Sequence, residues 1–152
     1  MEEVDAGAMP AVSAGRYIPR TRRCWERTLS KKYLIAIVDD DESVRQALTA
    51  LVRSLGYGAI AFAGAEQLLE SSRRDEISCL ISDVQMPGMN GLELCGRLAA
   101  DKKSIPTILI TAYPSERTHQ RAREAGVNGY LTKPFSEDDL ITCLHSALGL
   151  RR

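Results

Sequence analysis

Residues 33–45 read YLIAIVDDDESVR, an apolar run that passes directly into acidic side chains. A strand buried on both faces of a parallel sheet shows such an unbroken apolar run. The acidic residues Asp39, Asp40, Asp41 and Glu42 come where this strand would end. The stretch therefore predicts a buried strand that carries carboxylates to one edge of a sheet.

The same alternation continues along the chain, with helix-like segments between short β-like runs. Strict β/α alternation favours an α/β fold with an open, doubly wound parallel sheet and helices on both faces. The predicted strands cover residues 33–38, 58–63, 77–82, 105–110 and 129–132.

Two of the predicted helices carry clear end signals. The stripe from Val44 to Leu55 is followed by Gly56, a typical residue after a helix C-terminus. Ser136, with Asp139 three residues later, predicts a capping box at the start of the last helix.

Charge divides the chain into two parts, although 20 basic and 20 acidic residues give no net charge over the 152 residues. Residues 1–32 carry seven basic and four acidic side chains, whereas residues 33–152 carry 13 and 16. We expect a flexible, basic N-terminal extension over residues 1–32 and one domain over residues 33–150. A docking helix for an acidic partner is the alternative for the arginine-rich segment.

Composition also excludes several classes of protein. A near-neutral body argues against direct binding of nucleic acid. No apolar run approaches the roughly 20 residues that span a bilayer, so we expect a cytoplasmic protein without membrane contact. The four cysteines form no CxxC pair or Cys/His cluster, which predicts free thiols rather than a zinc site.

Polar residues follow the predicted strands at the edge where parallel sheets bind ligands. These are Asp39-Asp40, Asp83, Thr111 and Lys133. Any one of them could simply cap a helix or bond a loop, but together they suggest a common site. Clustered carboxylates favour a divalent cation such as Mg²⁺. A carboxylate, a cation, an ammonium and a hydroxyl suit a phosphoryl group, and an Asp can be its nucleophile.

Four segments are informative when taken together: IVDDDESVR at 37–45, SDVQMPGMNGLEL at 82–94, ILITAY at 108–113 and GYLTKPF at 129–135. With them, residues 33–148 resemble the receiver domain of two-component response regulators. Within that family the chain is most similar to receivers that drive helix-turn-helix outputs. The resemblance implies a flavodoxin-like, five-stranded parallel sheet in the order 2-1-3-4-5.

The resemblance implies that Asp83 accepts a phosphoryl group from a phosphohistidine of a sensor histidine kinase or histidine phosphotransfer protein. It implies Mg²⁺, with Mn²⁺ as a substitute, bound by Asp39, Asp40, Asp83 and the backbone carbonyl of Gln85. The chain would be a signalling switch, and its only activity would be its own phosphorylation and dephosphorylation.

The resemblance also assigns the residues that surround the acceptor. Lys133, which precedes a cis proline in the family, would pair with Asp83 or its phosphate. Thr111 and Tyr130 would form the switch. Gln85 and Tyr113 would tune the lifetime of the phosphate, and a bulky Tyr113 could slow attack by water.

The helix predicted over residues 115–125 offers only Ala122 and Ala125 for apolar contact, so it should move at low cost. The face it shares with the fifth strand and the last helix is the expected contact for a downstream protein, and for a homodimer on phosphorylation. His119 and His145 are expected at the surface.

Two other functions are compatible with the sequence. The chain could be the regulatory fragment of a DNA-binding transcription factor. Less favoured is an aspartyl-phosphate hydrolase, which would need a carboxylic acid where this chain has Gln85.

Overall fold

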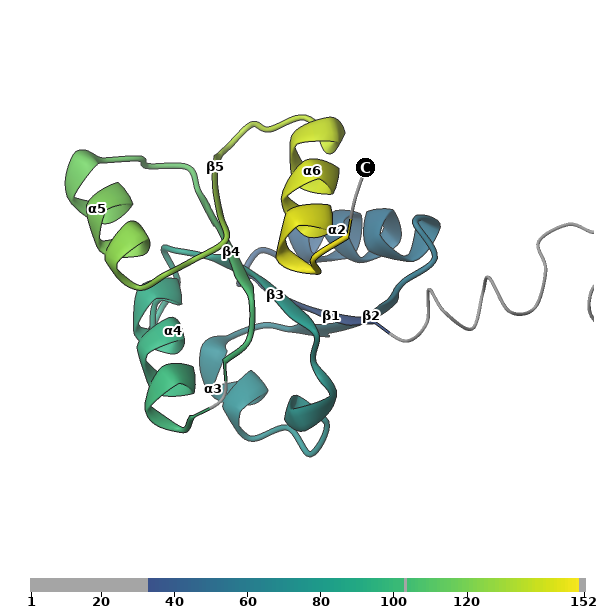
Figure 1. Ribbon diagram of the computed structural model, residues 1–152, viewed down its shortest axis with the longest axis horizontal. Helices are drawn as coiled ribbons and strands as arrows, with labels where there is room; N and C mark the ends of the chain where they lie inside the picture. Colours follow the sequence, from purple (N-terminus) through teal and green to yellow (C-terminus); the bar gives the residue numbers. More distant parts are fainter. Residues whose placement is uncertain (1–32, 103, 151–152) are drawn as a thin grey trace, which may run out of the picture. The chain divides into compact units, whose positions relative to one another are not determined.

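The computed structural model describes residues 33–102 and 104–150, so the extension predicted for residues 1–32 lies outside the described residues. Five strands and six helical segments alternate along the described part (Figure 1). They are β1 (Leu34–Val38), α2 (Glu42–Ser54), β2 (Gly58–Phe62), α3 (Ala65–Leu69), η1 (Arg74–Glu76), β3 (Cys79–Asp83), α4 (Gly91–Ala100), β4 (Thr107–Thr111), α5 (Glu116–Glu124), β5 (Gly129–Thr132) and α6 (Glu137–Ala147).

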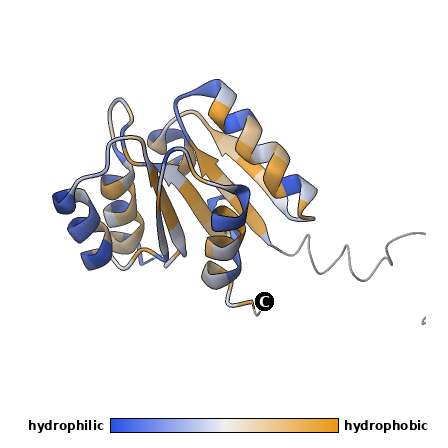
Figure 2. Ribbon diagram, turned by 90° about the horizontal axis from the view of Figure 1, so that it is seen from above, coloured by the Kyte–Doolittle hydropathy of each residue, from blue (hydrophilic) through white to orange (hydrophobic). Residues whose placement is uncertain are grey.

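The strands form one parallel sheet in the order β2-β1-β3-β4-β5. All residues of β1, β3 and β4, the three central strands, are buried. Figure 2 shows these strands as the hydrophobic centre of the molecule, with helices on both sides. The predicted doubly wound, flavodoxin-like fold is therefore confirmed.

Alternate side chains of the central strands pack under different helices, which explains why the runs are apolar throughout. Ile35, Ile37 and Ile81 pack with α2 and α6 on one face of the sheet. Ala36 and Leu80 pack with α3 and α4 on the other.

Helix α5 has a smaller apolar contact than its neighbours. Ala122 is its only buried residue, and it joins Val84, Leu92 and Leu109 in a separate cluster. The expectation that Ala125 also makes apolar contact is wrong, because Ala125 forms the C-cap and is exposed.

β1 begins one residue later than predicted, and β3 and β4 begin two residues later. β3 starts at Cys79 because Ser78 uses its hydroxyl to accept a hydrogen bond from the backbone of Leu34. β4 starts at Thr107 because Pro106, which precedes it, has no N–H to donate to a ladder.

The helix ends follow the predicted signals in part. Gly56 has a φ of 96° just beyond α2, as its place after the apolar stripe predicts. At α6 the hydroxyl of Ser136 accepts from the N–H of Asp139, which is one half of the predicted capping box. A complete box occurs instead at α4, between Asn90 and Glu93.

Within the described ranges, no helix combines the length and the hydrophobicity that crossing a membrane requires.

Candidate functional site

The predicted site residues lie where the strands end. Asp39 directly follows β1, and Asp83 is the last residue of the neighbouring strand β3. Thr111 ends β4, and Lys133 follows β5. Because all these strands are parallel, their carboxyl ends meet at one edge, and the sheet brings residues distant in sequence together.

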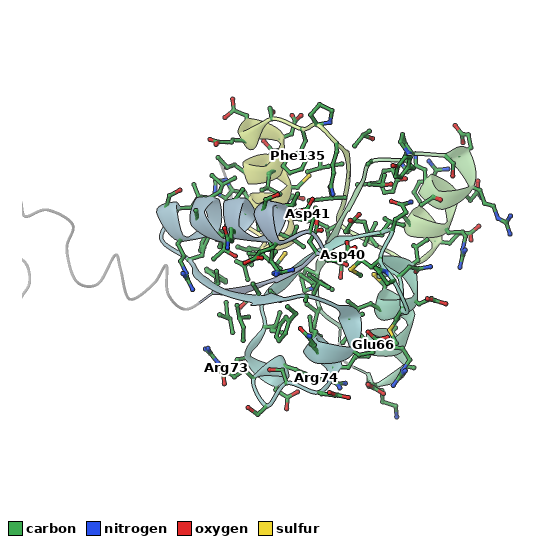
Figure 3. All side chains as sticks on the ribbon, turned by 180° about the vertical axis from the view of Figure 1, so that it is seen from behind. Asp40, Asp41, Glu66, Arg73, Arg74 and Phe135 are labelled. Atoms are coloured by element: carbon green, nitrogen blue, oxygen red, sulfur yellow. The ribbon has the colours of Figure 1, made fainter. Side chains whose placement is uncertain are left out.

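Asp39, Asp40 and Asp83 form an acidic group in which one carboxylate oxygen of each lies within 4.8 Å of the others. Asp39 is 1% exposed and Asp83 7% exposed, whereas Asp40 is open to solvent. Asp40 lies beside Asp41, where β1 passes into α2 (Figure 3). The acidic group is therefore buried at Asp39 and Asp83 and open to solvent at Asp40.

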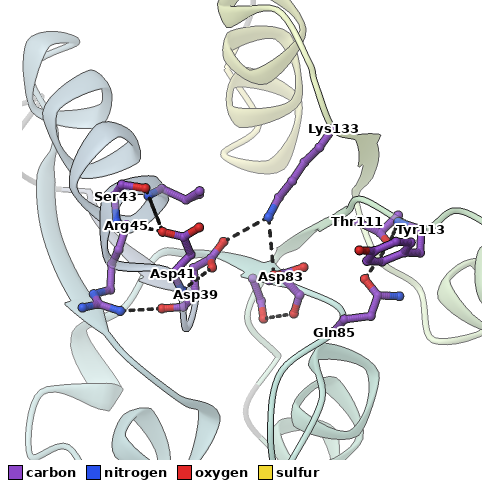
Figure 4. Close-up of polar contacts among 11 residues, drawn as sticks. Asp39, Asp41, Ser43, Arg45, Asp83, Gln85, Thr111, Tyr113 and Lys133 are labelled. Carbon is purple, nitrogen blue, oxygen red and sulfur yellow. Dashed lines mark hydrogen bonds and ion pairs between the residues drawn. The ribbon is translucent and has the colours of Figure 1, made fainter.

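The side chain of Lys133 reaches into this group between two carboxylates (Figure 4). Its Nζ lies 3.5 Å from Oδ2 of Asp39 and 3.4 Å from Oδ2 of Asp83. The Lys133–Pro134 peptide bond is cis, as the resemblance implies.

The surroundings of Asp83 disfavour the ionised form of its carboxyl group. Burial, and then the charge of Asp39, raise the pKa of the Asp83 carboxyl, while Lys133 opposes both effects. Its second oxygen, Oδ1, is buried and has no hydrogen-bond partner among the described residues. A buried carboxylate oxygen without a donor is a ready ligand for a cation.

The donor set fits a hard divalent ion. Carboxylate oxygens are the ligands that Mg²⁺ prefers, and this ion usually keeps several waters and binds few protein groups. One open carboxylate and two buried ones suit that preference, because waters and a phosphoryl group can enter from the open side. These residues could therefore hold a divalent ion.

The backbone around the acidic group is held by two further contacts. Nη1 of Arg45 donates to the carbonyl oxygen of Asp39 over 2.7 Å, and the N–H of Asp41 donates to Oδ1 of Asp39 over 2.9 Å (Figure 4). Asp41 itself caps α2 by accepting from the backbone of Ser43. Within the acidic run, Asp39 and Asp40 belong to the acidic group, whereas Asp41 caps α2.

Thr111 and Gln85 are joined directly. Oγ1 of Thr111 donates to Oε1 of Gln85 over 2.7 Å and accepts from the N–H of Tyr113 over 3.0 Å. The side chain of Tyr113 is 73% exposed. The switch residue Thr111 and the two residues expected to tune the phosphate lifetime, Gln85 and Tyr113, therefore form one hydrogen-bonded chain (Figure 4).

Tyr130 lies in β5 with its ring against the cluster around Ala122. Burial raises the pKa of its phenol, and the hydroxyl has no hydrogen-bond partner in the described part of the chain. Its ring stacks on that of His119, with centroids 4.7 Å apart. The two histidines expected at the surface are partly exposed: His119 lies against Tyr130, and His145 has a buried Nδ1.

Two groups that shape the loop after Asp83 are not among the residues that the sequence predicts for the site. Glu66 of α3, labelled in Figure 3, accepts from the N–H of Met89. A Cβ added to Gly91, the first residue of α4, would lie 2.5 Å from the carbonyl oxygen of Asp83. Glycine early in a helix signals such a close approach, but nothing in the sequence links Glu66 to a loop 23 residues away.

Comparison with known proteins agrees with this geometry. Residues 35–145 match the response regulator receiver domain, and the chain belongs to that family. It is 37% identical over 118 residues to nodulation protein W of Bradyrhizobium diazoefficiens, covering 78% of this chain and 52% of that protein. To the transcriptional regulatory protein FixJ of the same organism it is 32% identical over 120 residues, covering 79% and 58%. The chain thus spans about half the length of the curated relatives it matches.

Solved structures show the same fold. The response regulator StyR has a TM-score of 0.72 and 40% identity, with 78% of this chain and 60% of that chain covered. The chemotaxis protein CheY4 of Vibrio cholerae has a TM-score of 0.69 and 29% identity, with 76% and 98% covered. The chain is therefore a receiver domain of two-component signalling, and its acidic group is consistent with a phosphoacceptor site.

Proposed function

We propose that this receiver accepts a phosphoryl group on Asp83 from a phosphohistidine of a sensor histidine kinase or a histidine phosphotransfer protein. The observation that supports this most directly is the acidic group with Lys133 between two of its members. A buried carboxylate beside an ammonium and a divalent-ion site has what an acyl-phosphate needs: a nucleophile and compensation for the added charge.

In the proposed reaction an oxygen of Asp83 attacks phosphorus. The phosphorus–nitrogen bond of the phosphohistidine breaks, and the imidazole nitrogen keeps the electron pair. Asp39, Asp40, Asp83 and the backbone carbonyl of Gln85 would hold Mg²⁺, or Mn²⁺ in its place. When bound, the ion supplies positive charge that offsets the phosphoryl oxygens. Lys133 would pair with the phosphoryl group from the other side.

The proposed switch consists of Thr111 and Tyr130, which would respond to a phosphoryl group on Asp83. Thr111 would turn its hydroxyl toward the phosphoryl group, and Tyr130 would change its rotamer with it. The face formed by α5, β5 and α6 would then contact a downstream protein or a second copy of the chain. Weak apolar anchoring of α5 through Ala122 supports this, because such a helix shifts at low cost. In this role the chain is a cytoplasmic phosphoacceptor whose only activity is its own phosphorylation and dephosphorylation.

The test is incubation of the protein with Mg²⁺ and acetyl phosphate, followed by intact-mass measurement. We expect a gain of one phosphoryl group in the wild type, and none after addition of EDTA or in Asp83→Asn. Asp138→Asn is the matched control, since this exposed carboxylate in the first turn of α6 lies outside the acidic group. A gain that persists in Asp83→Asn would overturn the proposal.

A second proposal concerns the whole protein. Because the chain covers about half of its curated relatives, one of which is a transcriptional regulatory protein, we propose that this receiver regulates a DNA-binding output. The reading frame that encodes the chain tests this directly. A helix-turn-helix module encoded in the same frame would support the proposal, and its absence would refute it.

The hydrolase alternative is disfavoured by the position of Gln85. Its amide is not an acid, and its Oε1 already accepts from Thr111. Hydrolysis of a generic phosphate ester by the protein with Mg²⁺ would support the hydrolase alternative.

A further inference from the structure

The hydroxyl of Thr111 makes two hydrogen bonds in this structure. Its hydrogen is donated to Oε1 of Gln85 over 2.7 Å, and its oxygen accepts from the N–H of Tyr113 over 3.0 Å. Thr111 is 0% exposed, so water does not compete freely for this group. A hydroxyl has a single hydrogen to donate, and here Gln85 holds it.

Gln85 and the acceptor belong to the same segment. Gln85 comes two residues after Asp83, while Thr111 ends the neighbouring strand, in which Ile110 pairs with Asp83. Under the proposed function the hydroxyl of Thr111 has two competing acceptors: the amide oxygen of Gln85, which it bonds in this structure, and a phosphoryl group on Asp83. It cannot donate to both.

We propose that the side chain of Gln85 is a latch that positions the hydroxyl of Thr111 and competes with the phosphoryl group for its hydrogen. The inference rests on the proposed function and adds a role for the Gln85 amide, distinct from that of its backbone carbonyl. A neutral hydrogen bond of this kind is worth about a two- to tenfold shift in an equilibrium. The latch therefore weakens the activated state by that factor.

The matching variant is Gln85→Leu, which removes the acceptor, keeps a side chain of similar size and leaves the backbone carbonyl in place. The probe is beryllofluoride with Mg²⁺, which occupies the place of a phosphoryl group on a carboxylate without a covalent transfer. Binding is measured by titration of the full chain, and the Tyr113 amide resonance reports on the hydroxyl that it bonds.

We expect Gln85→Leu to bind beryllofluoride about two- to tenfold more tightly than the wild type. In a Thr111→Val background, where no hydroxyl remains to be released, Gln85→Leu should have no effect. This double-mutant cycle isolates the pairwise interaction from any change in the shape of the loop. Gln46→Leu, an exposed glutamine of α2 that bonds Glu42, is the matched control.

The possible outcomes separate the two proposals. If wild-type protein with Mg²⁺ does not bind beryllofluoride, the proposed phosphoacceptor function fails. If it binds but Gln85→Leu has no effect or weakens binding, the function stands and the latch is wrong. An equal gain in the wild-type and Thr111→Val backgrounds would show a steric effect of the side chain and also overturn the latch.

Discussion

The ammonium group of Lys133 lies 3.4 Å from a carboxylate oxygen of Asp83, although 50 residues separate the two in the chain. The same ammonium lies 3.5 Å from Asp39, so one positive charge serves two buried carboxylates. This sharing explains why Lys133 does not fully offset the burial and the neighbouring charge that raise the pKa of Asp83. The site carries excess negative charge until a cation binds.

Asp83→Asn should therefore stabilise the protein at pH 7 in the absence of metal. Because folding raises the pKa of Asp83 above its ordinary value of 3.8, the folded state binds this proton more tightly than the unfolded chain. Ionisation of Asp83 thus lowers stability as the pH rises above 3.8. The difference in the free energy of unfolding between Asp83→Asn and the wild type should increase as the pH rises above 3.8, and it should vanish at lower pH. Urea unfolding in EDTA from pH 3.5 to 7 measures it.

Asp138→Asn is the control, because it removes an exposed carboxylate that favours the N-terminus of α6. It should not stabilise the protein. Saturating Mg²⁺ should stabilise the wild type and reduce its difference from Asp83→Asn. Equal stability of wild type and Asp83→Asn at pH 7 would contradict this account of the site.

Gly91→Ala should destabilise the protein by about 2 kcal/mol or more, because the new Cβ would meet the carbonyl oxygen of Asp83 at 2.5 Å. Gly96→Ala in the same helix meets nothing within 4 Å and should instead stabilise by about 0.5–1 kcal/mol. Denaturant midpoints of the two variants give the comparison. The interpretation fails if both substitutions shift the midpoint in the same direction.

Arg45→Met should weaken Mg²⁺ binding by about tenfold, as expected for loss of a group that orients metal ligands. The reason is that Arg45 holds the backbone carbonyl of Asp39, and so the loop that carries Asp39 and Asp40. Arg53→Met is the matched control in the same helix, since Arg53 contacts the carbonyl of Ala59 at 3.5 Å, away from the acidic group. Isothermal titration with Mg²⁺ distinguishes them, and equal affinities for the two variants would refute the positioning role.

His119→Ala should loosen α5 without unfolding the domain. The ring of His119 stacks on Tyr130, and Ala122 is the only buried residue of this helix. Loss of an aromatic pair predicts amide exchange about two- to tenfold faster across α5. Exchange measured by mass spectrometry tests this, with His145→Ala as the control. Unchanged exchange in α5 would show that the stack contributes nothing to its anchoring.

Tyr113→Ala should shorten the half-life of the proposed acyl-phosphate, if the bulk of the side chain hinders water. The backbone bond from Tyr113 to Thr111 survives this substitution, so the effect reports on the ring alone. Tyr113→Phe keeps the ring and should retain the wild-type half-life. Loss of phosphate from the isolated phosphoprotein, followed by intact mass, provides the measurement. A half-life in Tyr113→Ala as long as that of the wild type counts against shielding.

The positions of the site residues were predictable from the sequence, because they depend on where strands end. An unbroken apolar run identifies a buried strand, and the first polar residue after it marks the edge of a parallel sheet. Asp39, Asp83, Thr111 and Lys133 are predicted at such strand ends, and all four lie at one edge of the sheet. The starts of β3 and β4 were less predictable, because the hydroxyl of Ser78 and Pro106 decide them.

The pairing of side chains was not predictable in this way. The bond from Thr111 to Gln85, the stack of His119 on Tyr130 and the contact from Glu66 to Met89 join residues on different elements. Such contacts depend on loop conformation and on rotamers, which hydrophobic periodicity does not encode. The sequence by itself therefore determined the sheet, the edge and the chemical types that meet there. Only the tertiary structure decided which hydroxyl, ring and ammonium bonds which partner, because directional contacts require the packed elements to set distance and angle.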